Sequence, residues 1–447
     1  MRESLSIILS MLILSACAGG NVFSRLNENL TSGDCPAAIA LVNEGGDAYG
    51  NNEQLLYLLD AAMVTMQCGD FDAAQAHFRS AEDLAESLWT ESISRNALSL
   101  VTNDTVFAYA GEDFERVMLH LMSAIGYLQA GRPDEALVEA RRLDTLLAVY
   151  NDKYETKNCY KEDAFARYLS GILHEADGDW DAAFIDYRRA VAVYREDYGV
   201  YDTGLPEILT ADLVRAASVV DRMDDIGGLV SGERIDRLSR LVISPDHAKV
   251  VFITFAGYAP RKVQEMVVVP TPHGPVGVAF PRMVVTPPRC SRGRLKLYAG
   301  DDRFESDLVL VEDINRIAVK NLDDRKGRIL AKAIARAVAK QVVIHGIARS
   351  GNDRNDRQAI EGILNLVNIF MVERADTRSW RTLPGRIYMT RMRVPAGEYV
   401  AELEACDGVV AEIGTLSMAP GTTRYLFRDL RYPAPAHAET KPDSARF

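Results

Sequence analysis

Three segments of the N-terminal half share one pattern, and this pattern constrains the fold more than any other feature. In each segment a glycine ends an amphipathic stretch, an alanine stands five positions after the glycine, and another small residue stands seven positions before it. Because two antiparallel helices approach closely only where their side chains are small, the pattern predicts three helix hairpins. The hairpins are Gln54–Leu84 (Ala62, Gly69, Ala74), Val117–Leu147 (Ala124, Gly131, Ala136) and Arg167–Tyr194 (Gly171, Gly178, Ala183).

The spacing within each hairpin resembles the tetratricopeptide repeat (TPR). The three glycines are 62 and 47 residues apart, whereas tandem repeats of this family recur about every 34 residues, so extra helices or loops are expected between them. The resemblance implies that partner proteins bind the concave surface formed by the first helices. These are Gln54–Gln67, Val117–Gln129 and Ala164–Ala176, with His120 and His174 as candidate contacts. The alternative for both histidines is packing between repeats or a plain surface position.

The first twenty residues, MRESLSIILSMLILSACAGG, contain an apolar run that stops at a cysteine. The run is shorter than the roughly 20 residues of a membrane-spanning helix, but it fits the core of a secretory signal. Leu14-Ser-Ala-Cys17 resembles the lipobox of bacterial lipoproteins, which implies removal of residues 1–16 and acylation of Cys17. Ala18 then implies release to the outer membrane. The sequence does not fix the leaflet; the expected side is the periplasm, with residues 17–34 as a lipidated linker. The alternative is an ordinary signal peptide or a buried strand.

Five cysteines follow Cys17, and none forms a C-x-x-C pair, so neither a zinc site nor a thioredoxin-type motif is indicated. In an oxidising periplasm disulfides are expected. Pro36–Glu44 and Glu53–Gln67 are predicted to be consecutive antiparallel helices, which would place Cys35 near Cys68. Cys290 with Cys406 is the second expected pair, and Cys159 would stay unpaired.

The two halves of the chain carry opposite net charge. Residues 21–225 contain 37 acidic and 16 basic residues, and residues 226–447 contain 25 acidic and 34 basic residues. Such asymmetry permits attraction between the halves, or a basic surface that faces anionic envelope polymer or lipid. The simpler alternative is two solvated faces without a specific partner.

The basic half has the strand and helix pattern of an α+β domain, expected over residues 240–431. Expected strands are Lys249–Phe255, Val263–Val269, Val276–Phe280, Leu295–Tyr298, Asp307–Val311, Arg386–Val394, Glu398–Cys406 and Arg424–Asp429, mainly antiparallel. Helices are predicted at Arg325–Ile347 and Arg357–Arg374. The first of these helices would carry Lys332, Arg336 and Lys340 on one face, for contact with an anionic surface or as the solvated side of a helix that covers the sheet. Residues 432–447 read as a disordered tail.

No catalytic, cofactor or metal motif stands out, so we expect a protein that is not an enzyme. The densest polar cluster is Asp376-Thr-Arg378-Ser-Trp380-Arg381, whose Arg378 and Trp380 could contact an anionic partner. Alternatively, the Asp–Arg pair caps the preceding helix and Trp380 anchors a domain junction.

The fold class we predict is multidomain, with an all-α TPR-like domain over residues 35–225 followed by the α+β domain. The expected function is that of a membrane-anchored periplasmic scaffold that binds envelope proteins through its TPR surface. Anionic envelope polymer is a further candidate partner. We expect no binding of nucleic acid. Two alternatives stay open: a regulator of peptidoglycan synthesis, and an envelope enzyme whose site is assembled from distant residues. The segment Asn21–Asp225 is expected to fold alone.

Overall fold

The computed structural model describes residues 18–44, 46–94, 106–153, 160–239, 247–270, 275–288, 290–349, 374–406, 408 and 410–432. Cys17, Cys159, the predicted helix Arg357–Arg374 except its last residue, and the predicted tail except Tyr432 lie outside these residues. Among the helices that are described, none combines the length and the hydropathy that a membrane span requires.

The N-terminal half is helical, and the three predicted hairpins are confirmed. They are formed by α5 (Gln54–Gln67) with α6 (Phe71–Ser94), α7 (Asp113–Gln129) with α8 (Pro133–Lys153), and α9 (Ala164–Asp177) with α10 (Trp180–Glu196). The three turn glycines have φ between 70° and 84°, a backbone conformation that glycine adopts without steric cost. Ala74, Ala136 and Ala183 are 0% exposed. A Cβ at Gly171 would lie 2.5 Å from the Tyr187 ring, so the close approach of α9 and α10 requires glycine there.

Further helices flank the hairpins on both sides. The flanking elements are α2 (Ala18–Thr31), α3 (Cys35–Glu44), α4 (Gly46–Tyr49), η3 (Tyr198–Tyr201), α11 (Glu207–Val219), η4 (Met223–Ile226) and α12 (Gly232–Ser239). The expected linker 17–34 is wrong as a description of the structure, because α2 buries Val22, Leu26 and Leu30 in the core. These three apolar side chains recur every four residues, which places them on one face of a helix.

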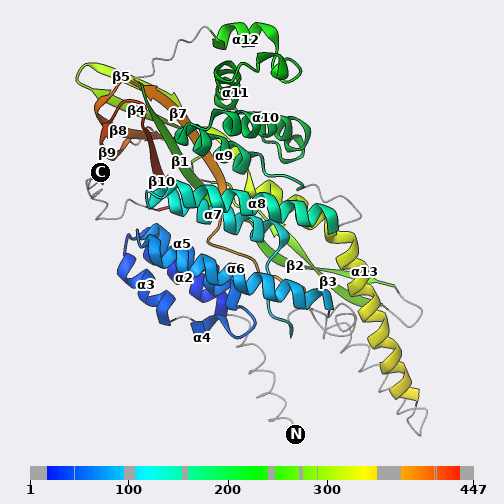
Figure 1. Cartoon of the computed structure of the whole chain (residues 1–447). Helices are drawn as coiled ribbons and strands as arrows, with labels where there is room; N and C mark the ends of the chain where they lie inside the picture. Colours follow the sequence, from blue (N-terminus) through cyan, green and yellow to red (C-terminus); the bar gives the residue numbers. More distant parts are fainter. Residues whose placement is uncertain are drawn as a thin grey trace.

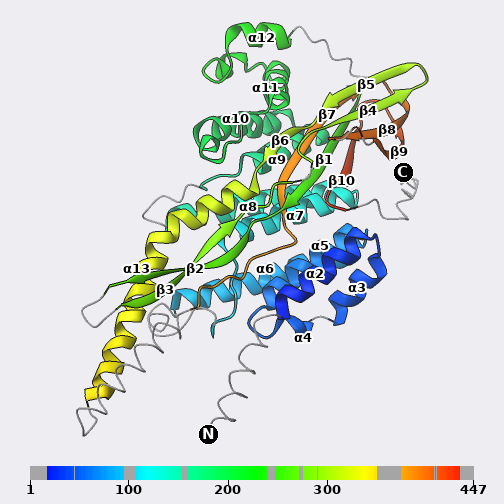
Figure 2. The ribbon, with the colours of Figure 1, turned by 180° about the vertical axis from the view of Figure 1, so that it is seen from behind.

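The C-terminal half contains two four-stranded sheets and a hairpin. The first sheet has the order β10 (Thr423–Asp429), β1 (Ala248–Tyr258), β7 (Pro384–Val394), β6 (Val309–Glu312). The second has the order β5 (Asp302–Asp307), β4 (Gly293–Ala299), β8 (Gly397–Ala405), β9 (Val410–Met418). The hairpin consists of β2 (Arg261–Val269) and β3 (Val276–Val284), and it lies along α13 (Ile314–Arg349), which extends away from the body (Figures 1 and 2).

The structure corrects three expectations for this half. β10 pairs with β1 in parallel, although all other strand pairs are antiparallel in the described sheets. The predicted strand Asp307–Val311 is divided at Leu308, because β5 belongs to one sheet and β6 to the other. The predicted helix Arg325–Ile347 begins earlier, at Ile314, and is 36 residues long.

The first sheet is the middle of three layers. Val251, Ile253 and Phe255 of β1 point toward the helices and join their hydrophobic core, whereas Val250 and Phe252 point toward the second sheet. This alternation follows from the two-residue period of a strand. Both faces of β1 are therefore buried, and the helical half shares its core with the first sheet.

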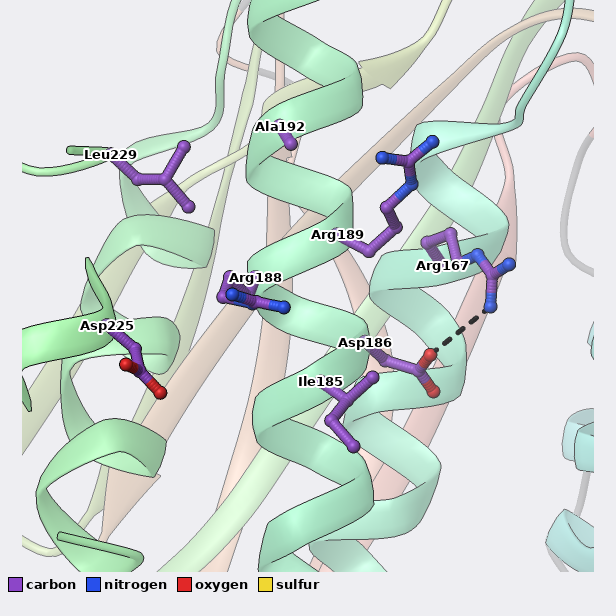
Figure 3. Close-up of a pocket in the computed structure, with 8 residues that line it drawn as sticks. All are labelled: Arg167, Ile185, Asp186, Arg188, Arg189, Ala192, Asp225 and Leu229. Carbon is purple, nitrogen blue, oxygen red and sulfur yellow. Dashed lines mark hydrogen bonds and ion pairs between the residues drawn. The ribbon is translucent and has the colours of Figure 1, made fainter. Parts of the chain in front are cut away.

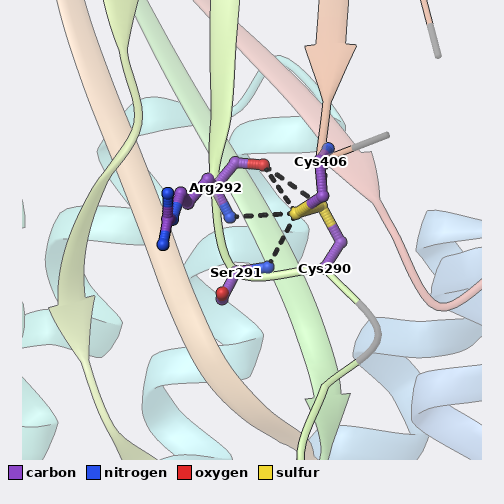
Figure 4. The surroundings of a disulfide bond; sticks show 4 residues. All are labelled: Cys290, Ser291, Arg292 and Cys406. Carbon is purple, nitrogen blue, oxygen red and sulfur yellow. Dashed lines mark hydrogen bonds between the residues drawn. A yellow bond between two sulfur atoms is a disulfide. The ribbon is translucent and has the colours of Figure 1, made fainter. Parts of the chain in front are cut away.

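Two disulfides connect cysteines that the sequence analysis paired. Cys35, at the start of α3, is bonded to Cys68, which ends α5, and their Cα atoms are 5.5 Å apart. Cys290 is bonded to Cys406 with Cα atoms 5.4 Å apart. The second bond ties the segment before β4 to the end of β8, where the backbone amides of Ser291 and Arg292 point at the Cys406 sulfur (Figure 4).

Candidate functional site

The inner face of the helical array, where the TPR resemblance places a partner, is occupied by the C-terminal half of the same chain. Thr382 donates a hydrogen bond of 2.6 Å to Asp60 on α5. The backbone amide of Trp380 donates one of 2.7 Å to Glu115 on α7, and Arg393 donates one of 3.0 Å to Glu175 on α9. One acidic side chain from each first helix thus contacts residues 380–393.

These carboxyl groups differ in their electrostatic surroundings. Burial raises the pKa of Asp60 and of Glu115, and the hydrogen bonds that each accepts only partly oppose this effect. Burial would also raise the pKa of Glu112, just before α7. The charges of Arg325 on α13 and Lys262 on β2 outweigh burial and lower the pKa of Glu112 to about 2. Both cations contact the Glu112 carboxylate directly. Glu112 therefore joins the helical array to the hairpin and to α13.

Glu175 is the centre of the largest ion cluster at this interface. Its carboxylate is 0% exposed and forms ion pairs with Arg215 on α11 at 2.7 Å, with Arg391 at 3.2 Å, with Lys249 at 3.1 Å and with Arg393 at 3.0 Å. Burial alone would raise the Glu175 pKa, but these cations hold it well below its usual range. A buried charge is tolerated only when it is paired and hydrogen-bonded, and Glu175 meets this condition through strands that lie more than 70 positions away in the sequence.

Asp212 on α11 completes the inner part of the cluster. It accepts from Arg215 at 2.7 Å, from Tyr168 at 2.7 Å and from Arg391. The acidic excess of the helical half and the basic excess of the sheet half therefore meet inside the molecule. Of the two arrangements that the charge asymmetry permits, attraction between the halves is the one seen in these contacts.

Arg378 and Trp380, predicted as partner contacts, are internal. Arg378 pairs with Asp376 at 2.7 Å and donates to the carbonyl oxygens of Asn52 and Phe107. Trp380 is 1% exposed and its indole N–H donates to Thr382. Both residues anchor the segment before β7 to the helices, which for Trp380 matches the alternative of a junction. The helix that the Asp–Arg pair was expected to cap lies outside the described residues except for Arg374.

His120 and His174, the other predicted contacts, are buried between helices. His120 is 6% exposed and its Nδ1 lies 2.9 Å from Glu139 on α8. His174 is 8% exposed and its Nε2 lies 3.7 Å from Asp186 on α10. Packing within and between hairpins is what the structure shows for both, because each imidazole contacts a side chain of a neighbouring helix.

One described cluster has the ligand types of a metal site. Glu82 of α6, His120 of α7 and Glu139 of α8 place one potential ligand atom each within 4.8 Å of one another. Arg142 contacts Glu82 at 2.9 Å and Glu139 at 3.2 Å, so the two carboxylates already have a cationic partner. The sequence analysis expected no metal ligands. A cluster to which three helices contribute one residue each has no characteristic spacing in the sequence.

The basic face predicted for α13 differs in the structure. Arg336 is 5% exposed and Lys332 is half-buried, while nothing is described of the Lys340 side chain. Ala333, Leu330 and Ile334 pack against Val278 of β3. Arg336 is therefore excluded from an exposed anion-binding face, because α13 lies against the β2–β3 hairpin.

A pocket of about 550 Å³ opens on the outer side of the array, beside α10. Its lining combines arginine, aspartate and apolar side chains, namely Arg167, Ile185, Asp186, Arg188, Arg189, Ala192, Asp225 and Leu229. Ile185 is 52% exposed. Arg188 lies beside α10 on the side where Asp225 and Leu229 also stand, whereas Asp186 is paired with Arg167 (Figure 3). The sequence analysis did not identify this pocket. One wall comes from α9 and α10, which precede α11 in the sequence, and the other from Asp225 and Leu229, which follow it.

No protein-family model matches this chain, and no curated protein matches it. Among solved structures, BtubC (BKLC) from P. vanneervenii is similar over 53% of this chain and 86% of that chain, with 14% identity and a TM-score of 0.33. A tetratricopeptide repeat protein from Parabacteroides merdae is similar over 49% of this chain and 83% of that chain, with 14% identity and a TM-score of 0.19. Both likenesses are weak.

Proposed function

We propose that this chain is a lipid-anchored protein of the bacterial outer membrane that binds a protein partner through the outer side of a TPR-like helical array. The observation that carries the proposal is the occupation of the inner face. Asp60, Glu115 and Glu175 are already paired with residues 380–393, so a partner has to use another surface. The signal and lipobox pattern that ends at Cys17 supports export and anchoring.

The pocket beside α10 is the surface that suits a partner best. Ile185, Ala192 and Leu229 offer apolar contact, and Arg188 offers a positive charge among them. A volume of about 550 Å³ is of the size that encloses one or two side chains or a small ligand. The matching partner segment carries an apolar side chain next to a carboxylate.

At two of the described histidines, His120 and His174, the surroundings favour packing over catalysis. A general base must come within hydrogen-bond reach of its substrate. His120 and His174 are 6% and 8% exposed and are engaged by Glu139 and by Asp186, so a substrate has no access to either imidazole in this structure.

Photo-crosslinking in intact cells tests the proposal. A crosslinking amino acid in place of Ile185 should give a discrete protein adduct, and Arg188→Glu in the same chain should abolish it. The matched control places the crosslinker at Val410, an apolar residue of β9 that is 48% exposed, where no such adduct is expected. If the crosslinker at position 185 gives no adduct in the chain that keeps Arg188, or if the adduct persists in the Arg188→Glu chain, binding at this pocket is contradicted.

The anchor is tested separately by Cys17→Ala. Because Cys17 is the thiol at the lipobox position, we expect the variant to stay unprocessed or to leave the membrane fraction after a salt wash. Normal processing together with retention in the outer membrane would show that the lipoprotein proposal is wrong. Hydrolysis of an envelope substrate by the purified wild-type protein would count against the scaffold and for the enzyme alternative.

A further inference from the structure

A row of polar side chains crosses the first sheet at the end nearest α9 and α10. In the strand register Lys249 of β1 lies opposite Thr423 of β10 on one side and opposite Arg393 of β7 on the other. All three point to the helix-facing side of the sheet, because Val251 and Ile253 of β1 alternate with the same period into the helical core. Two cations directly opposite each other on neighbouring strands repel unless an anion lies between them.

The anions that the chain supplies there do not balance the cations. Four cations, Arg215, Arg391, Lys249 and Arg393, surround Glu175, and Asp212 serves only the first two of them. Lys249 and Arg393 both contact a single oxygen, Oε1 of Glu175, at 3.1 Å and 3.0 Å. Among the ion pairs of the described residues, Lys249 and Arg393 thus share one carboxylate oxygen as their anionic partner.

Two hydroxyl groups on the same face of the sheet are also unsatisfied. Thr423 Oγ1 and Tyr425 Oη are buried and have no hydrogen-bond partner in the part of the chain that the structure describes. Tyr425 lies one step along β10 on the same face, opposite Val251. A buried hydroxyl without a partner is costly, so two of them beside two under-neutralised cations indicate a place for a group that accepts hydrogen bonds and carries negative charge.

The two cations are partly exposed to solvent. The side chains of Lys249 and Arg393 are 14% and 21% exposed, whereas that of Glu175 behind them is fully buried. The Trp180 ring, at the start of α10, lies 5.4 Å from the Lys249 ammonium and forms one wall. A ligand can therefore reach the two cations from outside without opening the core.

We propose that Lys249, Arg393, Thr423 and Tyr425 form a binding site for a phosphate group. A phosphate monoester carries about −1.5 to −2 charges at neutral pH and offers three acceptor oxygens, which matches two excess cations and two free hydroxyl donors. Arginine and lysine bind phosphate through short charge-assisted hydrogen bonds. Burial and the neighbouring Arg215 and Arg391 lower the pKa of Arg393 to about 10, and Glu175 only partly opposes this effect. The site is independent of the outer pocket beside α10.

Calorimetric titration of the purified full-length chain with inorganic phosphate tests the site. Wild type should bind, and Lys249→Gln and Arg393→Gln should each weaken binding by about tenfold or more, the usual effect of removing a hydrogen bond to a charged group. Lys296→Gln is the matched control, because Lys296 on β4 also pairs with one carboxylate, Glu404 at 2.6 Å, and lies outside the site. Its affinity should equal that of wild type.

Thr423→Val keeps the test decisive if the charge variants fail to fold. The substitution removes the hydroxyl without changing charge or shape, so the folded chain should lose several-fold in phosphate affinity. No binding by wild type at millimolar phosphate, or equal binding by wild type and all three site variants, would overturn the proposal.

A second titration identifies the source of the phosphate. Vesicles that contain phosphatidic acid present a phosphate monoester, whereas vesicles that contain phosphatidylglycerol present only a diester. Binding to the first kind of vesicle that is lost in Lys249→Gln would assign a lipid headgroup as the ligand. Binding to free phosphate without any binding to vesicles would assign a soluble phosphate compound, and either result supports the site.

Discussion

The guanidinium group of Arg393 lies 3.0 Å from the carboxylate of Glu175, although 218 positions separate the two residues. This contact belongs to a set in which strands of the basic half neutralise buried acids of the helical half. It holds the helical half against the first sheet, with which that half shares a hydrophobic core. It also explains why the inner face of the array is unavailable to a partner.

Replacement of Glu175 by glutamine should destabilise the protein strongly. The change removes the negative charge that four cations share, and leaving buried charges unpaired costs about 3–5 kcal/mol. Chemical denaturation of the full-length chain measures the loss. Glu398→Gln, at an exposed position of β8, is the control and should stay within about 0.5 kcal/mol of wild type. Equal stability of both variants would show that the cluster contributes little.

Glu112 should make stability depend on pH in the acid range. Its pKa is lowered from 4.5 to about 2 in the folded protein, so its contribution is fully present above pH 4.5 and is lost as the pH falls from there toward 2. Glu112→Gln should be less stable than wild type at pH 7 and should lack this part of the acid decline. The free energy of unfolding, measured between pH 7 and pH 3, checks both statements. Parallel curves for wild type and variant would contradict the pairing with Lys262 and Arg325.

Gly171→Ala should disrupt the third hairpin. A methyl group at this position would lie 2.5 Å from a ring carbon of Tyr187, and overpacking of a core typically costs about 1–3 kcal/mol. Gly327→Ala is the matched control, since Gly327 is also in a helix but has no atom near its virtual Cβ. That control should gain up to about 1 kcal/mol from helix propensity. A neutral effect of Gly171→Ala in thermal unfolding would count against the close approach of α9 and α10.

The bond between Cys35 and Cys68 should stabilise the start of the array. It closes a loop with a sequence separation of 33 residues, for which the chain-entropy model gives about 3–4 kcal/mol. The double variant Cys35→Ala, Cys68→Ala should lose about this amount relative to the oxidised wild type, and its stability should not respond to reductant. Peptide mapping under non-reducing conditions checks the pairing, and free thiols at both positions would refute it.

The hairpins were predictable because their determinants are local. A turn glycine with positive φ, an alanine five positions on and a small residue seven positions back are all visible within one segment, as in the hairpin that contains Gly171, Gly178 and Ala183. Most strands of the basic half were likewise visible from their apolar runs. The parallel pairing of β10 with β1 was not, because pairing direction depends on which strands meet and not on the sequence of either strand.

The ion cluster could not be predicted from the sequence. Arg391 and Arg393 alternate with Met392 and Val394 along β7, and such alternation normally indicates one solvated face. Here helices cover the face that carries the arginines, so both faces of the strand are buried. Glu175 has no local signal either, since its partners come from α11, β1 and β7. For His120 and His174 the sequence could not decide between partner contact and packing, because only the fold shows that neighbouring helices cover them.

Hydrogen exchange of the helical half in isolation is the most direct test of the account. The sequence analysis expected Asn21–Asp225 to fold alone; the structure leads to the opposite prediction, because Glu175 and Asp212 would lose Arg391, Arg393 and Lys249. For residues 18–239 produced alone, the amides of α7 and α9 should lose the protection that they have in the full-length chain. If α7 and α9 keep the same protection in the isolated half, the inner face does not depend on the C-terminal half, and the central claim is contradicted.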